Sequence, residues 1–403
     1  MDTGLPIDYS PFSPGKPVPV EQFIGRDAEL TRLVRHVDAA AKGRLQVAFL
    51  AGDRGIGKSS LATYIKSYAD RNCNMVGVHV FLGGTDTLEE MTRRVFEKVL
   101  RESNDKKWYE PIKSLFGKSV ESADLFGLQL KFVPDAQQLD SLVRNFGYAI
   151  KNLINKLREA KKAVGLVLVL DDINGLAASK QFADWLKSLI DSLATDSDPV
   201  ALCLMVVGLD ERRQSLVELN LSLARAFDLF ELKPWSDTET ETFFRESFQR
   251  HGIKFDEKAI HLMALYSGGR PELAHEIGDA TFREDTDKFI SEEDASNGIV
   301  AAVEMIGRKY LRAQVLDEIK RSKIYRPMLR KVARSVSHGS LTFERNKLKD
   351  VLTSSEFANV DNFLRRMKEI GVIVGDENEA GVYRFASYVH HLYVYMSNEK
   401  PKP

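Results

Sequence analysis

The architecture expected for this chain follows from one stretch, Gly52-Asp53-Arg54-Gly55-Ile56-Gly57-Lys58-Ser59-Ser60. Its first eight residues have the spacing G-x-x-x-x-G-K-S. They follow the mostly apolar run 45–50 and lead into a helical pattern that begins at Ser60. A strand, a glycine-rich loop and a helix in this order indicate a phosphate-binding P-loop, because the glycines let backbone N–H groups point at phosphate oxygens. The helix N-terminus adds partial positive charge. We therefore expect all nine residues to contact a bound nucleoside triphosphate.

Two side chains of this motif have specific expected roles. Lys58 would reach the β- and γ-phosphates, and the Ser59 hydroxyl would ligate Mg²⁺. The alternative is a glycine turn in an ordinary α/β domain. The flanking strand and helix favour the P-loop over that turn.

Composition limits the class of protein. A length of 403 residues predicts two or three domains, and a net charge of -1 gives the whole chain no signature of polyanion binding. Cys73 and Cys203 lie far apart in sequence, which suits reduced thiols better than a disulfide or a metal site. The N-terminus lacks a signal-peptide pattern, and the longest apolar run, 163–170, is too short to cross a bilayer. We expect a cytoplasmic protein without a membrane segment.

Four further apolar runs predict core strands, and together with 45–50 they predict a five-stranded parallel sheet. They are 75–82, 164–170, 201–208 and 228–232. The run 164–170 is apolar without interruption, as expected for a strand buried on both faces. It ends in Asp171-Asp172, at the edge where open α/β sheets bind ligands. A pair of helix N-cap residues is the alternative interpretation of the two aspartates.

These motifs resemble those of the AAA+ ATPases, in particular the STAND and origin-initiator-like branches. The P-loop and the strand that ends in two aspartates are similar to the Walker A and Walker B motifs. Residues 23–30, Phe-Ile-Gly-Arg-Asp-Ala-Glu-Leu, are similar to the F-x-G-R-x-x-E-L box of these families. The resemblance implies a Mg²⁺-dependent ATPase with ATP as ligand, and it places Gly25 and Arg26 beside the adenine.

The resemblance also implies roles for the acidic pair. Asp171 would hold Mg²⁺, and Asp172 would polarise the attacking water where many relatives carry glutamate. Aspartate is one methylene shorter than glutamate. This difference from the relatives concerns the hydrolysis of ATP and not its binding. A second departure is the end of the run 201–208, where relatives carry a polar sensor residue and this chain reads Gly208-Leu209-Asp210.

Two arginines have roles that only the resemblance suggests. Arg225 stands where relatives carry an arginine finger and would complete the site of a neighbouring subunit; a structurally paired arginine is the alternative. Gly269-Arg270-Pro271 is similar to the G-x-P element of a helical lid, so Arg270 would sense phosphate, although relatives often carry that arginine after the proline. A plain helix–turn–helix explains Arg270-Pro271 equally well.

The C-terminal part predicts a winged helix-turn-helix. Helices over 326–335, 343–352 and 360–370 are followed by a hairpin of 372–374 with 382–385. The third helix has an apolar stripe, and its outward residues would face a DNA groove: Asn359, Asn362, Arg365, Arg366 and Lys368.

Positive charge is concentrated just before this third helix. From Arg308 to Asp350 there are 13 basic and 4 acidic residues, a net charge of +9. Such a surface attracts double-stranded DNA, although an ion-paired helical face is the plain alternative. We expect an ATP-dependent switch acting on DNA, or a signalling or scaffold ATPase whose winged helix binds protein or autoinhibits. Self-association is compatible with both.

Less regular segments complete the expected plan. Residues 118–132 predict an inserted hairpin of unknown role within 103–137, and one long helix is expected over 138–161. The expected divisions are an N-terminal arm (1–20), a P-loop core (21–233), a helical lid (234–307) and a winged-helix domain (308–403).

Overall fold

The computed structural model describes residues 10–103, 120–123, 129–132, 134–159, 163–336, 341–376 and 379–397. The chain forms two compact units. Pro17–Lys233 make the first, which we call the P-loop unit, and Met1–Lys16 with Pro234–Pro403 make the second, the C-terminal unit. The division between a lid and a winged-helix domain at 307/308 stays a prediction.

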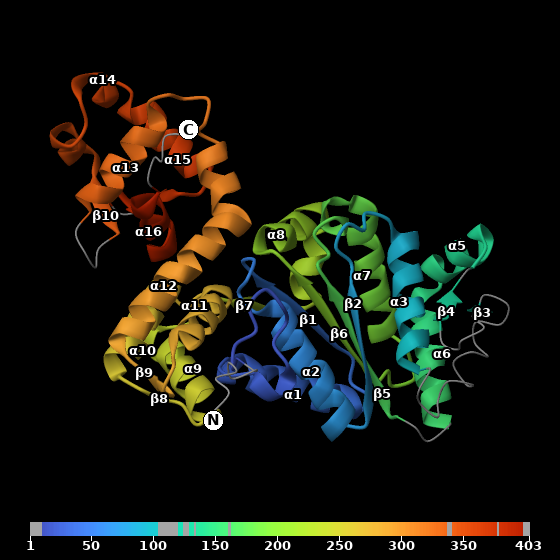
Figure 1. Cartoon of the computed structure of the whole chain (residues 1–403). Helices are drawn as coiled ribbons and strands as arrows, with labels where there is room; N and C mark the ends of the chain where they lie inside the picture. The colour runs from blue at the N-terminus through green and yellow to red at the C-terminus, as the bar shows by residue number, and fades with distance from the viewer. Residues whose placement is uncertain are drawn as a thin grey trace. The chain divides into compact units, whose positions relative to one another are not determined.

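A five-stranded parallel sheet organises the P-loop unit, in the order β2-β5-β6-β1-β7 (Figure 1). The five predicted strands are confirmed. They are β1 (Gln46–Gly52), β2 (Met75–Phe81), β5 (Gly165–Asp171), β6 (Leu202–Gly208) and β7 (Asp228–Leu232).

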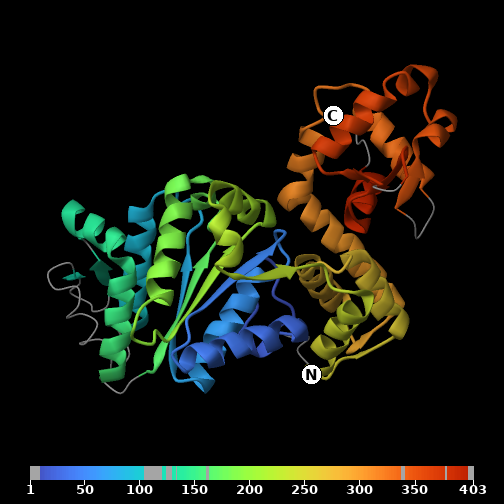
Figure 2. The same cartoon turned by 180° about the vertical axis from the view of Figure 1, so that it is seen from behind.

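Helices cover both faces of this sheet, which is why its central strands are apolar on both sides (Figures 1 and 2). In β1, Ala48 and Leu50 pack with α1 (Asp27–Ala41) and α2 (Lys58–Asn72). Phe49 points the other way, into a core shared with the helices on the second face. These are α3 (Leu88–Ser103), α6 (Phe146–Glu159), α7 (Lys180–Ala194) and α8 (Asp210–Leu219).

Two predictions for the inserted region have different outcomes. The hairpin is confirmed in its strands, since β3 (Val120–Ala123) and β4 (Gln129–Phe132) pair antiparallel. The single helix over 138–161 is wrong: α5 (Ala136–Arg144) ends before α6 starts, and 160–162 lie outside the described residues. Asn145 separates them, with φ -106° and a side-chain amide that donates to the Ser141 carbonyl at 2.9 Å. Such a hydrogen bond from a side chain to a nearby carbonyl competes with the backbone hydrogen bonds of the helix.

The first helices of the C-terminal unit have local start and stop signals. The Ser236 Oγ accepts the Glu239 N–H at 3.2 Å, and the Glu239 carboxylate accepts the Ser236 N–H at 2.8 Å. Gly269 must be glycine, because its φ is 70° and a Cβ would lie 2.1 Å from the Trp235 carbonyl oxygen. The elements are α9 (Asp237–Gln249), β8 (Lys254–Phe255), α10 (Glu257–Ser267), α11 (Pro271–Glu284), β9 (Phe289–Ile290) and α12 (Glu292–Ile306).

The N-terminal segment is part of this helical core. Phe12 is buried against the rings of Phe243 and Phe248, with centroids 5.8 and 5.3 Å away. The Ser13 N–H donates to His275 Nδ1 at 3.2 Å. The chain therefore joins the two units twice, at 16/17 and at 233/234.

The rest of the C-terminal unit contains the predicted hairpin and third helix, with one correction. The expected helix over 343–352 is reduced to a 3₁₀-helix over 345–350, because Phe343 pairs with Tyr383 as part of a third strand. The three strands form an antiparallel sheet in the order β10-β12-β11. The elements are the π-helix η5 (Gly307–Asp317), α13 (Tyr325–Ser335), β10 (Thr342–Glu344), the 3₁₀-helix η6 (Arg345–Asp350), α14 (Ser354–Phe357), α15 (Val360–Glu369), β11 (Ile373–Gly375), β12 (Val382–Phe385) and α16 (Tyr388–Met396).

No described helix is long and apolar enough to span a bilayer. Both cysteines are free thiols, Cys203 in the core and Cys73 partly exposed.

Two buried histidines make the C-terminal unit sensitive to acid. Burial lowers the pKa of His275 from 6.5 to about 4. Because the folded pKa lies below the unfolded one, this histidine stabilises the fold fully above pH 6.5, and the contribution is lost as the pH falls towards 4. At pH 5 the loss is on the order of 2 kcal/mol.

We therefore expect the thermal unfolding temperature of the full chain to fall between pH 7 and pH 5, and to fall less in His275→Gln. Burial also lowers the pKa of His390 to about 4, so part of the dependence will remain. An identical pH dependence in wild type and variant, followed by calorimetry, would contradict the assignment.

Candidate nucleotide site

The loop between β1 and α2 has the backbone that a P-loop requires. Gly52, Gly55 and Gly57 have φ of 149°, 73° and 95°, values that other residues rarely adopt. A Cβ at Gly52 would also lie 2.6 Å from the Leu232 carbonyl oxygen on β7. Ile56 is buried and anchors the loop, while Asp53 and Arg54 are exposed. Sequence and packing therefore both require glycine at Gly52.

Lys58 folds over this loop. Its Nζ donates to the carbonyl oxygens of Gly52 at 2.8 Å and Asp53 at 2.6 Å. Burial lowers the pKa of Lys58, and the carboxylates of Asp171, Asp53 and Asp172 act in the opposite direction. The ammonium therefore lies within electrostatic reach of both aspartates at the end of β5. Since β6 lies between β5 and β1, the two strand ends are about 10 Å apart.

Asp171 is buried at the end of β5 and has a partner that the sequence analysis did not identify. Its Oδ2 lies 2.8 Å from His79 Nε2, and His79 Nδ1 lies 3.2 Å from Thr63 Oγ1. Thr63 in turn donates to the Ser59 carbonyl at 2.8 Å. A continuous set of contacts thus joins the two predicted magnesium ligands. The sequence feature that could have indicated this partner is His79 itself, a lone polar residue in the apolar run of β2.

Asp172 has a strained backbone and a fixed carboxylate. Its φ is 58°, and the Asn174 amide donates to its Oδ1. The Asn174 Oδ1 accepts the Leu209 N–H at 3.1 Å. Asn174 therefore supplies a polar side chain beyond the end of β6, where Gly208-Leu209 has none. Asp210 does not fill that role, because it pairs with Arg213 at 2.7 Å.

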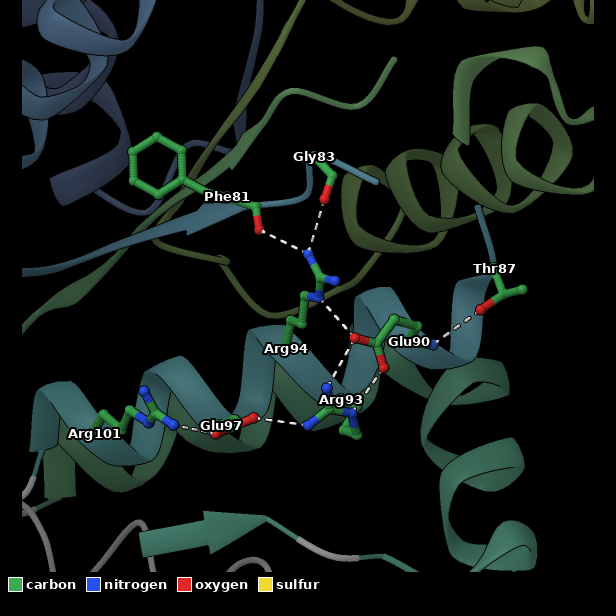
Figure 3. Close-up of polar contacts among 8 residues, drawn as sticks. All are labelled: Phe81, Gly83, Thr87, Glu90, Arg93, Arg94, Glu97 and Arg101. Atoms are coloured by element: carbon green, nitrogen blue, oxygen red, sulfur yellow. Dashed lines mark hydrogen bonds and ion pairs between the residues drawn. The ribbon is translucent and has the colours of Figure 1, made fainter. Parts of the chain in front are cut away.

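A loop held by Arg94 packs against Asp172 from the side of β2. Arg94 Nη1 donates to the carbonyl oxygens of Phe81 and Gly83, both at 3.3 Å (Figure 3). Glu90 holds Arg94 at 2.7 Å and also binds Arg93, which lowers the pKa of Glu90 to about 2. A Cβ at Gly83 would lie 2.7 Å from Asp172 Oδ2. The Arg94 network therefore shapes one wall beside the predicted water-polarising residue.

The F-x-G-R box contacts the P-loop directly. Gly25 has φ 81° and Arg26 φ 64°, and the buried Arg26 Nη2 donates to the Ile56 carbonyl at 3.1 Å. Arg26 thus supports the loop backbone. The Ser60 Oγ accepts the Val18 N–H at 3.2 Å, which fixes the first residues of the P-loop unit to the start of α2.

The two remaining predicted arginines lie away from these groups or in the other unit. Arg225 ends the 3₁₀-helix η4 (Leu221–Arg225), is exposed, and precedes the amino end of β7, at the sheet edge opposite the P-loop. It cannot serve the site of its own chain. Arg270 precedes Pro271 at the start of α11 in the C-terminal unit, near His390 and Tyr310. Their roles toward nucleotide stay predictions.

The residues present fit a magnesium ion that is bound together with phosphate. No cluster of three or more His, Cys, Asp or Glu residues in the described ranges could hold a metal alone. Mg²⁺ commonly takes one or two protein ligands and completes its shell with phosphate oxygens and water. Ser59 and Asp171 would supply those ligands, and the ion would neutralise phosphate charge.

We predict that Lys58→Ala lowers the affinity for ATP about 100-fold or more, because it removes a charge-assisted contact with phosphate. Isothermal titration calorimetry measures this. Lys66→Ala is the matched control, since Lys66 lies on the same helix and pairs with Glu102 at 3.5 Å. Unchanged affinity in Lys58→Ala would refute the site.

A second prediction concerns Asn174. Asn174→Ala should reduce ATP turnover about tenfold and leave ATP affinity within twofold, because it frees the Asp172 carboxylate without touching the P-loop. Turnover assays at saturating ATP and a binding titration separate the two effects. Equal losses in both, or a loss in neither, would show that Asn174 does not position Asp172.

Comparison with known proteins agrees with this geometry. Residues 22–206 match a family model described as the AAA ATPase domain. No curated protein matches the chain significantly.

Solved structures share the fold at low sequence identity. A Walker-type ATPase of Pyrococcus abyssi is 17% identical, with a TM-score of 0.54 over 93% of this chain and 96% of that one. The ORC2 protein of Aeropyrum pernix, solved as ADPNP–ADP complexes, is 12% identical, with a TM-score of 0.56 over 96% of this chain and 94% of that one. Residues 22–206 therefore form an ATP-binding AAA+ ATPase domain of the P-loop type, in a chain whose fold is similar to that of the Aeropyrum pernix ORC2 protein.

Proposed function

We propose that this chain is an ATP-driven switch whose C-terminal unit binds double-stranded DNA. The observation that carries the proposal is helix α15. It buries Val360, Phe363, Leu364 and Met367 in its own unit, and its opposite face is polar and basic. Asn362, Arg365 and Lys368 are exposed on that face, and Arg366 is partly exposed.

The surroundings of α15 support its use as a recognition helix. Helices α13 and α14 precede it and the β11–β12 hairpin follows it, the element order of a winged helix-turn-helix. In that motif the recognition helix presents side chains to the major groove. Phosphate contacts from the basic residues between Arg308 and Asp350 would add affinity that does not depend on DNA sequence.

ATP would act on DNA binding through a change in populations. ATP binds in the P-loop unit, and the chain connects this unit to the C-terminal unit at two places. A ligand shifts such an equilibrium only if it binds one state more tightly, so ATP must favour one arrangement of the connected units. Arg225 would act in a neighbouring subunit, and Arg270 as a lid sensor, both as parts of this proposal. A reducing, cytoplasmic location also belongs to it.

A signalling or scaffold role of the STAND type is the second candidate, and one observation favours it. The Arg366 guanidinium already pairs with Glu318 at 2.5 Å and Glu369 at 3.2 Å, and Arg365 donates to the Asn362 amide oxygen at 3.0 Å. DNA binding would have to replace these contacts. In this alternative α15 contacts protein or its own chain.

Salt-dependent DNA binding separates the two candidates. We expect the full chain to bind a short duplex, and the double change Arg365→Ala with Arg366→Ala to weaken binding at least tenfold. The slope of log affinity against log salt should fall by about 0.9 for each of the two arginines that contacts a phosphate rather than a base edge.

Fluorescence anisotropy with and without ATP, over a salt series, measures both quantities. Arg250→Ala is the matched control, because Arg250 is an exposed arginine of the same unit, paired with Glu246 at 2.9 Å. No duplex binding at low salt, with or without ATP, would reject the DNA proposal and favour the protein-binding alternative.

A further inference from the structure

A cavity of about 520 Å³ lies within the C-terminal unit, and neither α15 nor the P-loop unit contributes to its lining. It is bounded by the end of α12, the π-helix η5, the start of α13 and the end of α16. Its volume is within the usual range for small-molecule sites, about 300–1,000 Å³.

One wall is a row of residues spaced by four: Glu304, Arg308, Arg312, Leu316 and Lys320. In an α-helix a step of four slightly exceeds one turn, whereas the i→i+5 bonding of a π-helix makes the turn longer than four residues. A step of four residues therefore rotates slightly past one full turn in an α-helix and falls short of one full turn in a π-helix. Where α12 continues into η5, these two rotations are opposite and partly cancel. The wider helix therefore keeps Arg308 and Arg312 on the side of the cavity, while Leu311 and Val315 are buried behind them.

The cavity contains four cations, Arg308, Arg312, Lys320 and Arg326, and two carboxylates, Glu304 and Asp317. Across the described ranges none of the four cationic groups forms a side-chain hydrogen bond or ion pair. Arg326 Nε is shielded from solvent and lacks a hydrogen-bond partner there. A buried donor without a partner is costly, so Arg326 Nε is available to an acceptor that enters the cavity, whether water or a ligand oxygen.

Tyr393 adds a fixed polar wall. A Cβ on Gly307 would lie 2.4 Å from the Tyr393 ring, so the ring packs directly on the η5 backbone. Burial raises the pKa of Tyr393, Arg312 and Arg326 oppose that shift, and Asp317 adds to it. The phenol therefore remains a neutral donor at physiological pH and lies within reach of the charges around the cavity.

We infer that this cavity binds a phosphate group. A phosphate offers several acceptor oxygens and up to two negative charges, which match converging guanidinium groups better than a carboxylate does. The phosphate has two possible sources, a free polyphosphate or nucleotide and the backbone of duplex DNA. Only the second source depends on the function proposed above.

The first arm of the test uses tripolyphosphate and the full chain carrying Lys58→Ala, which removes the P-loop as a competing site. We expect calorimetry to detect binding, and the added pair Arg312→Gln with Arg326→Gln to weaken it more than tenfold. The control pair Arg250→Gln with Lys258→Gln removes equal charge from the same unit, outside both the cavity and the basic segment 308–350, and should change affinity less than twofold. Circular dichroism checks that each variant is folded.

The second arm measures duplex binding of the same variants by anisotropy. Loss of tripolyphosphate binding alone assigns the cavity to a free phosphate ligand, and loss of duplex binding alone assigns it to a DNA backbone. Either result, or both, supports the inference. If neither ligand responds to the cavity pair, or the control pair has the same effect, the inference is wrong. The Arg365→Ala with Arg366→Ala experiment tests DNA binding by α15 separately. A wrong inference about the cavity can therefore be distinguished from absent DNA binding by α15.

Discussion

Parallel pairing of β1 and β5 with β6 is the constraint on which the nucleotide site depends. The register places Asp171 beside Val207 and Ala51 beside Gly208, so the P-loop and the acidic strand end leave the sheet at the same edge. A slip of one residue would turn every side chain of a strand to the other face. Both faces of β5 are buried in apolar surroundings, and this burial resists such a slip. A slip would move the Asp171 carboxylate into the apolar core. The packing of the strands therefore sets the distance between the P-loop and Asp171, which bound magnesium and phosphate must span. The contacts of Lys58 do not set this distance.

The polar groups at this edge hold one another in place. Asp171 is buried with His79, and His79 reaches the P-loop helix through Thr63. Buried polar groups need partners, so this set connects β2, β5 and α2 as well as any apolar contact does. Asp172 is held differently, by Asn174 on one side and by the Gly83 loop on the other. The buried aspartate thus belongs to the fold, while the exposed one is oriented by two short loops.

The sequence predicted the features that local patterns encode and missed those that depend on tertiary partners. The five strands and the P-loop glycines are local, since apolar runs and glycine spacing specify them. The partnership of His79 with Asp171 joins residues 92 apart, and Asn174 reaches Leu209 35 positions away. The strand at Phe343 was mistaken for a helix because its pairing partner, Tyr383, lies 40 positions later in the register. No pattern within a window of a dozen residues contains that information.

The π-helix η5 connects the phosphate cavity to the proposed DNA-binding helix. One side carries Arg308 and Arg312 into the cavity, and another side contacts α15, where the Gln314 amide donates to the Ile370 carbonyl at 3.2 Å. Glu318, directly after η5, holds Arg366. The same helix therefore lines the cavity with one side and supports the carboxyl end of α15 with another. Arg366 pairs with Glu318, and neither residue lines the cavity, so the cavity and the exposed face of α15 use separate cations.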